Sequence, residues 1–281
     1  MSDSLRPSPE RLQTDWAGRV HADREQVARS REVDDGDDFY EPVVDRFRLN
    51  PRRPDDDVLE LLLSHARVEE TWIDVGAGSG RYALPLALRV REVIAVEPSR
   101  SMVTALREDA RKHGIGNVRV VSERWPLAKR PSGADVSLIA HIGYDIAEIG
   151  AFLDALEGST RRLCIAVMGE SAMTTVARLF WHGLHGEPRV RLPALPELLM
   201  LLLARGRLPE VRLVDRPPAS FESVEEALSM ARRQLWVREG SDKDRRLAEW
   251  VPRALRPAPG GKVTFDEGRS RIGVVTWQPR T

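Results

Sequence analysis

The stretch that most constrains the fold is residues 71–81, which read TWIDVGAGSGR. A short apolar run, Trp72 and Ile73 with Val75, is typical of a buried parallel strand. Three glycines follow it at alternate positions, Gly76, Gly78 and Gly80. Residues 83–88 are rich in helix formers and predict a helix whose free N–H groups point back at the turn. Strand, glycine turn and helix N-terminus together predict a ligand cradle, in which a Cβ would hinder both positive φ and close approach.

The spacing of this turn argues against two common phosphate-binding motifs. The dinucleotide fingerprint G-x-G-x-x-G, counted from Gly76, requires a small residue where Arg81 stands. A Walker loop ends in Gly-Lys-Ser/Thr, and no lysine lies near this turn. Asp74 stands at the strand end instead. A carboxylate there would repel a pyrophosphate and suits a ligand that carries an ammonium or sulfonium group.

Residues 71–81 closely resemble motif I of the class I S-adenosylmethionine-dependent methyltransferases, in particular their small-molecule branch of type 11/25. The resemblance continues through 93–99 (VIAVEPS), 118–123 (VRVVSE) and 134–141 (ADVSLIAH), which look like the second, third and fourth strands of that family. It covers about residues 71–168. Four motifs in this order are specific for the fold and the cofactor, and they leave the methyl acceptor open.

The resemblance implies S-adenosyl-L-methionine as cofactor and assigns roles to single residues. Glu97 matches the acid that holds the two ribose hydroxyls, although a solvated charge at a strand end is the alternative. Glu123 matches the acid beside the adenine amino group, but with Arg124 it could equally form a surface ion pair. The expected cofactor-binding residues are Asp74, Gly76, Ala77, Gly78, Gly80, Arg81, Glu97, Pro98, Ser99, Met102, Glu123 and His141.

His141 and Tyr144 are the candidate catalytic residues. A neutral imidazole at the end of the fourth strand could take a proton from an acceptor hydroxyl or amine. Methyl transfer from a sulfonium often needs only alignment, so a histidine that lines the pocket is the competing interpretation. Tyr144 could orient the acceptor or simply pack.

The predicted fold is α/β, with a doubly wound, mostly parallel seven-stranded sheet of the Rossmann-like methyltransferase type. Ser99 is expected to cap a helix that runs to His113, and the strand–helix–strand connection around it implies parallel pairing. Strands at 211–214 and 271–277 complete the sheet, and the resemblance implies that the last one is antiparallel. N-terminal helices precede the sheet and a helical insertion follows its fifth strand.

These expectations divide the chain into four parts. Residues 1–38 form a polar tail and helix, 39–168 the cofactor-binding core, 169–207 a helical insertion or cap, and 208–281 the rest of the sheet with added helices. A helix around 39–49 could cover the cofactor cleft or pack on the core. The helix at 196–204 is hydrophobic all round and must be covered. It could cap the substrate pocket, dock on a partner subunit or fill an inserted subdomain.

Composition limits the remaining function classes. The 43 Lys and Arg residues balance 43 Asp and Glu, so no overall charge attracts nucleic acid or an anionic membrane. Cys164 is the single cysteine and reads as a small buried hydrophobe. His182 and His185 have no obvious further metal ligands, so no metal site is expected. We find no signal-peptide pattern and no apolar run long enough to span a bilayer, and we therefore expect a cytoplasmic protein.

The leading hypothesis is an S-adenosylmethionine-dependent methyltransferase that acts on a small molecule. Nucleic acid is a disfavoured substrate, since residues 141–144 read HIGY and lack the Asn/Asp-Pro-Pro-Tyr element of base-amino methyltransferases. The alternative is a non-catalytic cofactor-binding module that works through a partner protein or a homo-oligomer, such as a homodimer. A nicotinamide dehydrogenase is a third reading, disfavoured by Arg81.

Overall fold

The computed structural model describes residues 7–128, 133–172, 174–216, 218–266 and 270–280, so the first six residues of the expected tail lie outside it. The chain alternates helices with strands through its first two thirds. The helices are α1 (Pro9–Ser30), the 3-10 helix η1 (Glu41–Phe47), α2 (Asp57–Ser64), α3 (Ala83–Ala87), α4 (Arg100–Lys112), α5 (Ile149–Gly158), α6 (Thr175–His185), α7 (Leu195–Ala204), α8 (Val224–Gln234), α9 (Asp242–Ala254) and η2 (Pro259–Gly261). The strands are β1 (Thr71–Val75), β2 (Glu92–Val96), β3 (Val118–Val121), β4 (Ala134–Ala140), β5 (Thr160–Gly169), β6 (Glu210–Arg216), β7 (Ser220–Phe221), β8 (Leu255–Pro257), β9 (Val263–Phe265) and β10 (Ser270–Trp277).

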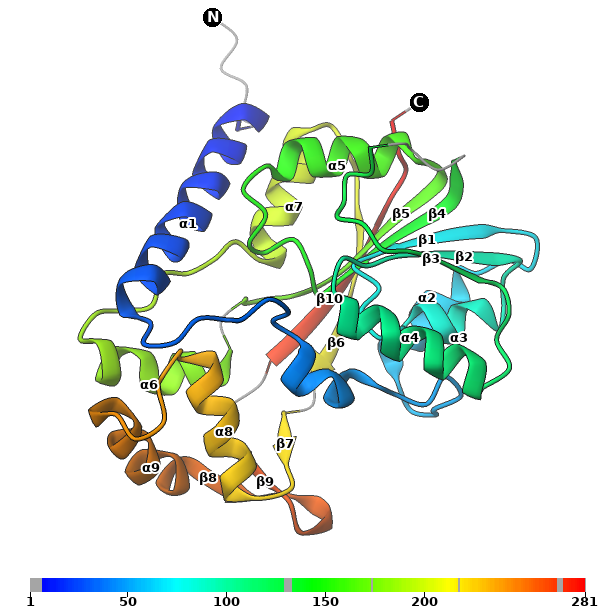
Figure 1. Cartoon of the computed structure of the whole chain (residues 1–281). Coiled ribbons are helices and arrows are strands. Elements are labelled where there is room, and N and C mark those ends of the chain that lie inside the picture. Colours follow the sequence, from blue (N-terminus) through cyan, green and yellow to red (C-terminus); the bar gives the residue numbers. More distant parts are fainter. Residues whose placement is uncertain (1–6, 129–132, 173, 217, 267–269, 281) are drawn as a thin grey trace, which may run out of the picture.

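The main sheet has seven strands in the order β3-β2-β1-β4-β5-β10-β6 (Figure 1). The first five are parallel, and β10 runs antiparallel to both β5 and β6. The predicted doubly wound fold is confirmed, including the antiparallel last strand. The chain order reverses between β1 and β4, and the crevice at such a switch point is where open α/β sheets bind ligands.

Helices cover both faces of this sheet (Figure 1). On one face, α2, α3 and α4 bury Leu62, Leu84 and Leu106 in one apolar cluster. On the other face, α1, α5 and α7 form a second cluster with the inward side chains of β4, β5 and β10. Both faces of the central strands are therefore buried, which explains why β1 carries apolar side chains on both faces, Trp72 on one and Ile73 and Val75 on the other.

Helix α7, hydrophobic all round in the sequence, is covered by the sheet and by α1. Leu195 sits so close to β10 that a Cβ built on Gly273 would lie 2.6 Å from Leu195 Cδ2. Helix α1 crosses α5 and α7 and buries Trp16 and Val20 against them. Met200 and Leu203 remain exposed on the outer side of α7.

A smaller α/β unit stands beside the main sheet, at the lower left of Figure 1. It consists of α6, α8 and α9 with the three-stranded sheet β7-β9-β8, and these elements share one apolar cluster that includes Trp181, Phe221 and Phe265. The structure thus divides the segment 169–207, since α6 joins this unit while α7 covers the main sheet. We call α6, α8, α9 and β7–β9 the side unit.

The segment before α2 differs from the helix expected at 39–49. It forms η1, and none of the η1 residues is buried. Its aromatic spacing produces a ring cluster instead, because Tyr40 lies 5.2 Å from Phe39 and 5.7 Å from Phe47 between ring centres. The segment is fixed by polar contacts on both sides, to the glycine turn and to the side unit.

Within the part of the chain that the structure describes, no helix combines the length and the apolar character needed to cross a membrane.

Candidate active site

The glycine turn joins β1 to α3 at the switch point. The N–H groups of Gly76 and Ala77 donate to the carbonyl of Val96, at 2.8 and 3.1 Å, and so tie the turn to the end of β2. Ser79 donates from its hydroxyl to the carbonyl of Phe47 at 2.6 Å, which brings η1 onto the turn. The turn is therefore held from both sides before any ligand binds.

Within the turn, Gly78 and Gly80 have opposite surroundings. Gly80 has φ +92°, and a Cβ there would lie 2.7 Å from Leu84 Cγ, inside the core. Gly78 has φ +56°, and the nearest atom to its Cβ position is Met102 Sδ at 4.0 Å. Gly80 is thus required by packing, whereas Gly78 leaves open space of the kind that a ligand can approach.

Glu97 follows β2 and is the polar centre of this site. Its Oε2 accepts from the Gly78 N–H at 2.9 Å, and its Oε1 accepts from the Ser99 N–H at 2.8 Å. The side chain is 5% exposed. Burial raises the pKa of Glu97, and the two backbone donors oppose that rise. The carboxylate is thus fixed beside the open side of Gly78.

Asp74 lies behind Glu97 at the end of β1. Its Oδ1 is buried and has no hydrogen-bond partner among the described residues. Burial raises the pKa of Asp74 to about 7, and the charge of Glu97 adds to the rise. An unpartnered carboxyl oxygen beside a second carboxylate favours a cationic ligand, because a positive charge would stabilise both ionised acids.

The N-terminus of α4 completes the cradle and depends on a residue that sequence reasoning missed. Ser99 caps α4, and its hydroxyl accepts from the Met102 N–H at 3.2 Å, as expected. Asp38 accepts from the Ser99 hydroxyl at 2.9 Å and from the Ser101 N–H at 2.9 Å. Tyr40 lies near the same place, since its backbone N–H donates to Asp38 Oδ1 at 3.1 Å.

We expect Asp38→Ala to weaken binding of S-adenosylhomocysteine by about three- to tenfold, because one charge-assisted bond of this kind contributes about 1 kcal/mol or more. Calorimetry measures this directly. Asp37→Ala is the matched control, since Asp37 is exposed and forms no hydrogen bond or ion pair with the described residues. Equal affinities for the two variants would show that Asp38 does not support the cradle.

The ends of β4 and β5 lie beside the turn and carry the two candidate catalytic residues. His141 has φ +59°, and its ring centre lies 6.3 Å from that of Tyr82. The surrounding protein atoms desolvate the His141 ring and lower its pKa to about 4, and the positive charges of Arg81 and Arg216 lower it further. Part of the side chain is nevertheless exposed to solvent. Tyr144 Oη accepts from the Gly169 N–H at 2.8 Å and so links the two strand ends.

The remaining predicted residues occupy the edges of the site. Arg81 is exposed, with its guanidinium carbon 5.3 Å from the centre of the Tyr82 ring. Pro98 is exposed between Glu97 and Ser99, and Glu123 is exposed two residues beyond β3. His182 and His185 lie on α6 in the side unit, where the His185 ring lies tilted against that of Trp181, with ring centres 4.2 Å apart. The described residues contain no group of three side chains suited to a metal ion.

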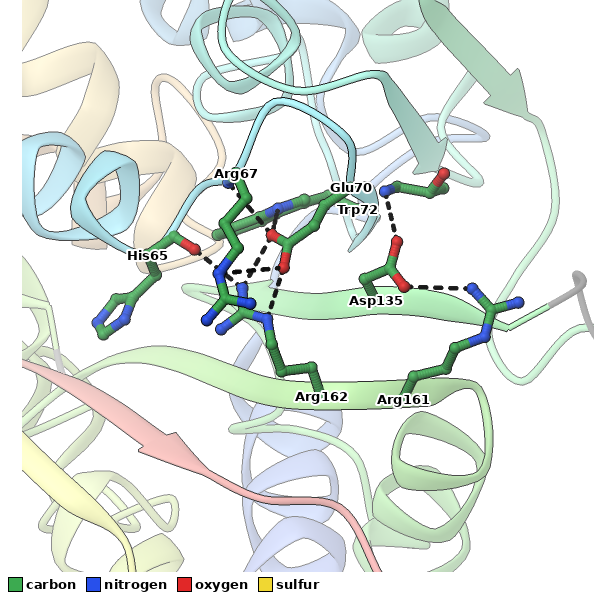
Figure 2. Close-up of polar contacts among 8 residues, drawn as sticks. His65, Arg67, Glu70, Trp72, Asp135, Arg161 and Arg162 are labelled. Atoms are coloured by element: carbon green, nitrogen blue, oxygen red, sulfur yellow. Dashed lines mark hydrogen bonds and ion pairs between the residues drawn. The ribbon is translucent and has the colours of Figure 1, made fainter.

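A second polar cluster lies at the opposite, amino-terminal edge of the sheet (Figure 2). Arg162 donates to both oxygens of Glu70, at 2.6 and 2.8 Å, and Asp135 accepts from the Thr71 N–H at 2.8 Å. A cavity of about 380 Å³ opens between these residues and Arg161. Glu70 pairs with Arg162 and Asp135 pairs with Arg161, and both pairs lie at the edge opposite the switch point, so we interpret the cluster as a clamp between strands.

Comparison with known proteins agrees with this fold and with the methyltransferase class. Residues 73–154 match the family of methyltransferase domains. The "Probable cobalt-precorrin-6B C(15)-methyltransferase (decarboxylating)" of Methanothermobacter thermautotrophicus is 28% identical over 136 residues, which are 45% of this chain and 70% of that protein. A 23S rRNA (uracil(1939)-C(5))-methyltransferase of Aeromonas hydrophila is 45% identical over 87 residues, but the match spans only 18% of that protein and 28% of this chain.

Solved structures share the fold. YcgJ from Bacillus subtilis superposes with a TM-score of 0.55 at 16% identity, covering 79% of this chain and 98% of that one. A structure from Bacillus halodurans gives a TM-score of 0.56 at 14% identity, covering 80% and 99%. The matched domain, the sheet order and the glycine turn with its acids agree, and the chain carries a methyltransferase domain of the class I S-adenosylmethionine-dependent type.

Proposed function

We propose that this enzyme methylates a small molecule bound at the carboxyl ends of β4, β5 and β6, next to the cofactor. The observation that carries the proposal is the convergence of His141, Tyr144 and Arg216 at this edge. Tyr144 Oη accepts a hydrogen bond from the N–H of Gly169, at the end of β5. The positive charge of Arg216, at the end of β6, acts on both His141 and Tyr144. The site thus has a polar wall fixed by three strands.

The cofactor residues fit S-adenosylmethionine. Glu97 offers two oxygens to the ribose hydroxyls, the open side of Gly78 admits the ligand, and the unpartnered Oδ1 of Asp74 suits its positive charge. Bound there, the cofactor supplies an electrophilic methyl group on a sulfonium. The chain's own contribution is to orient the nucleoside and to place the acceptor in line with that methyl group.

His141 and Tyr144 act by positioning the acceptor. An imidazole with a pKa of about 4 stays neutral at pH 7 and is a weak base, so it can exchange hydrogen bonds but holds a proton poorly. Burial raises the pKa of Tyr144, which keeps its phenol protonated and available as a donor. These properties favour an acceptor whose nucleophilic atom loses its proton without help from the enzyme.

Charge pairing favours a small acceptor over RNA. Arginines in and beside the side unit are matched by acids, as in the pair between Arg46 of η1 and Glu226 of α8 and the pair Arg232–Asp244, the latter at 2.6 Å. RNA binding relies on arginine and lysine side chains that are free to contact phosphates. The RNA methyltransferase relatives match only short parts of their own length, while the precorrin relative is matched over most of its length.

Transfer of a radiolabelled methyl group tests the acceptor class. The protein is incubated with methyl-labelled S-adenosylmethionine and with three fractions of a cell extract: small molecules, total RNA and total protein. We expect label in the small-molecule fraction. Label that accumulates in RNA or protein would overturn the proposed acceptor class. Calorimetry with S-adenosylhomocysteine against NAD tests cofactor choice separately, with binding expected for the first ligand alone.

The pKa of His141 can be measured without knowing the methyl acceptor. In an NMR titration we expect one histidine resonance, absent in His141→Gln, with a pKa of about 4 instead of the usual 6.5. Between pH 6.5 and 4 the unfolded chain would then bind more protons at this residue than the folded one, so its contribution lowers stability as the pH falls. A His141 resonance that titrates near 6.5 would contradict the proposed positioning role and restore general base catalysis.

A further inference from the structure

The outer edge of the main sheet carries an exposed apolar patch. Strand β6 pairs with β10 on one side, and among the described residues no strand pairs with its other side. We call the patch the β6 edge, and it combines this strand with the outer side of α7. Its exposed apolar members are Met200 (44% exposed), Leu203 (47%), Leu208 (84%), Val211 (36%) and Leu213 (48%).

These side chains lie on one face of the sheet. Leu213 and Val211 pair across the ladder with Gly273 and Val275. Gly273 lies directly under Leu195, and Val275 belongs to the apolar cluster that contains α7. Because side chains alternate along a strand, Val211 and Leu213 face the side on which α7 lies. An unpaired strand edge flanked by apolar side chains favours association with another strand.

The charges on β6 select the partner. In a symmetric antiparallel pair of identical strands, a two-fold axis exchanges each pair of facing residues. Hydrogen-bonded and non-hydrogen-bonded pairs alternate along the ladder. The axis must therefore pass through one residue that faces its own copy.

The charge pattern then selects the central residue. Pairing centred on Arg212 would set two arginines face to face, and pairing centred on Val214 would set Arg212 against Arg216. Pairing centred on Leu213 sets Glu210 against Arg216 at both ends and Leu213 against its own copy. Opposite charges that face each other stabilise such a pair, and like charges destabilise it.

We propose that the β6 edge binds a second copy of this chain, forming a two-fold dimer in which β6 pairs antiparallel with β6 around Leu213. The two sheets then continue into one another across the axis. The α7 helices of both copies lie on the same face beside the axis, so Met200 and Leu203 are covered together with Leu213. Each copy also offers Glu210 to Arg216 of the other.

Disulfide trapping tests the register. The chain's one cysteine, Cys164, is buried, so a single added thiol reports on its own position. Leu213→Cys is expected to form a disulfide-linked dimer under mild oxidation, because the two copies of residue 213 face each other within about 5 Å. Val211→Cys is the control on the same strand and face. Its two copies are separated by four residues along the strand, about 14 Å, and should not crosslink.

Sedimentation of the full chain tests the charges. Wild-type protein should show a mass of twice 31.6 kDa at micromolar concentration. Glu210→Arg and Arg216→Glu should each weaken the dimer about tenfold or more, and the double variant should regain the wild-type dissociation constant. A monomeric wild type, or a dimer that neither single variant weakens, would overturn the proposal. Equal crosslinking at 211 and 213 would also overturn it.

Discussion

Replacing Glu97 by alanine is expected to weaken the binding of S-adenosylhomocysteine by about ten- to a hundredfold. Hydrogen bonds to a charged group contribute about 1.5–3 kcal/mol, and Glu97 is the acid placed to receive the ribose hydroxyls. The variant also leaves the N–H groups of Gly78 and Ser99 without their present acceptor. Calorimetry gives the affinity, and circular dichroism shows whether the fold is retained.

Two companion variants sharpen this test. Glu92→Ala is the matched control, because Glu92 lies at the other end of β2 and pairs with Arg119 at 3.0 Å. Glu97→Gln keeps the size and one acceptor oxygen, and we expect an intermediate affinity. If Glu97→Ala bound the ligand as tightly as Glu92→Ala, the assignment of the cofactor site around Glu97 would fail.

Gly80→Ala and Gly78→Ala are expected to separate folding from binding. At Gly80 the new Cβ meets Leu84 and Leu106 with φ at +92°, which no other residue adopts without strain. We expect a loss of about 2–5 kcal/mol in unfolding free energy. At this chain length that corresponds to a fall in melting temperature of about 3–8 °C.

At Gly78 we expect the opposite result, a loss of cofactor affinity with little change in stability. Its φ of +56° lies in the left-handed region that alanine can enter at modest cost, and the Cβ points into open space near Met102. We expect a melting temperature within a few degrees of the wild type and a loss of cofactor affinity of about tenfold or more, because the methyl group occupies ligand space. A Gly78→Ala protein with unchanged affinity would place the ligand elsewhere.

Local sequence rules were sufficient for the cofactor half of the fold. The strands β1 to β5 and the Ser99 cap of α4 follow from apolar runs, glycine turns and capping chemistry, and each is confirmed. These signals are local, since an apolar run or a serine cap depends on neighbours within a few residues. The family, its cofactor and its enzyme class followed from the resemblance of the same motifs to those of class I methyltransferases.

Contacts between distant segments could not be predicted. In the side unit, α6 packs with α8 and α9, although α7 and β6 separate them in the sequence. The spacing of apolar residues does not distinguish a helix that packs in the side unit from one that packs on the main sheet. Asp38 reaches Ser99 and Ser101 through a 3-10 segment whose aromatic spacing resembles that of an α-helix. The low pKa of His141 depends partly on Arg216, which lies on a different strand far along the chain. The functional roles of the site residues stay predictions until the variants are measured.

The part of the side unit made of α8, α9 and β7–β9 leaves the main sheet and rejoins it at one place. Arg216 at the end of β6 faces Ser270 at the start of β10, so the intervening residues close a hairpin whose ends are fixed by the ladder. Insertions in such a closed excursion cost little, because closure entropy grows slowly with length. Evolution, or a protein engineer, could therefore exchange this excursion and reshape acceptor recognition while β1, β2 and the glycine turn continue to fold unchanged.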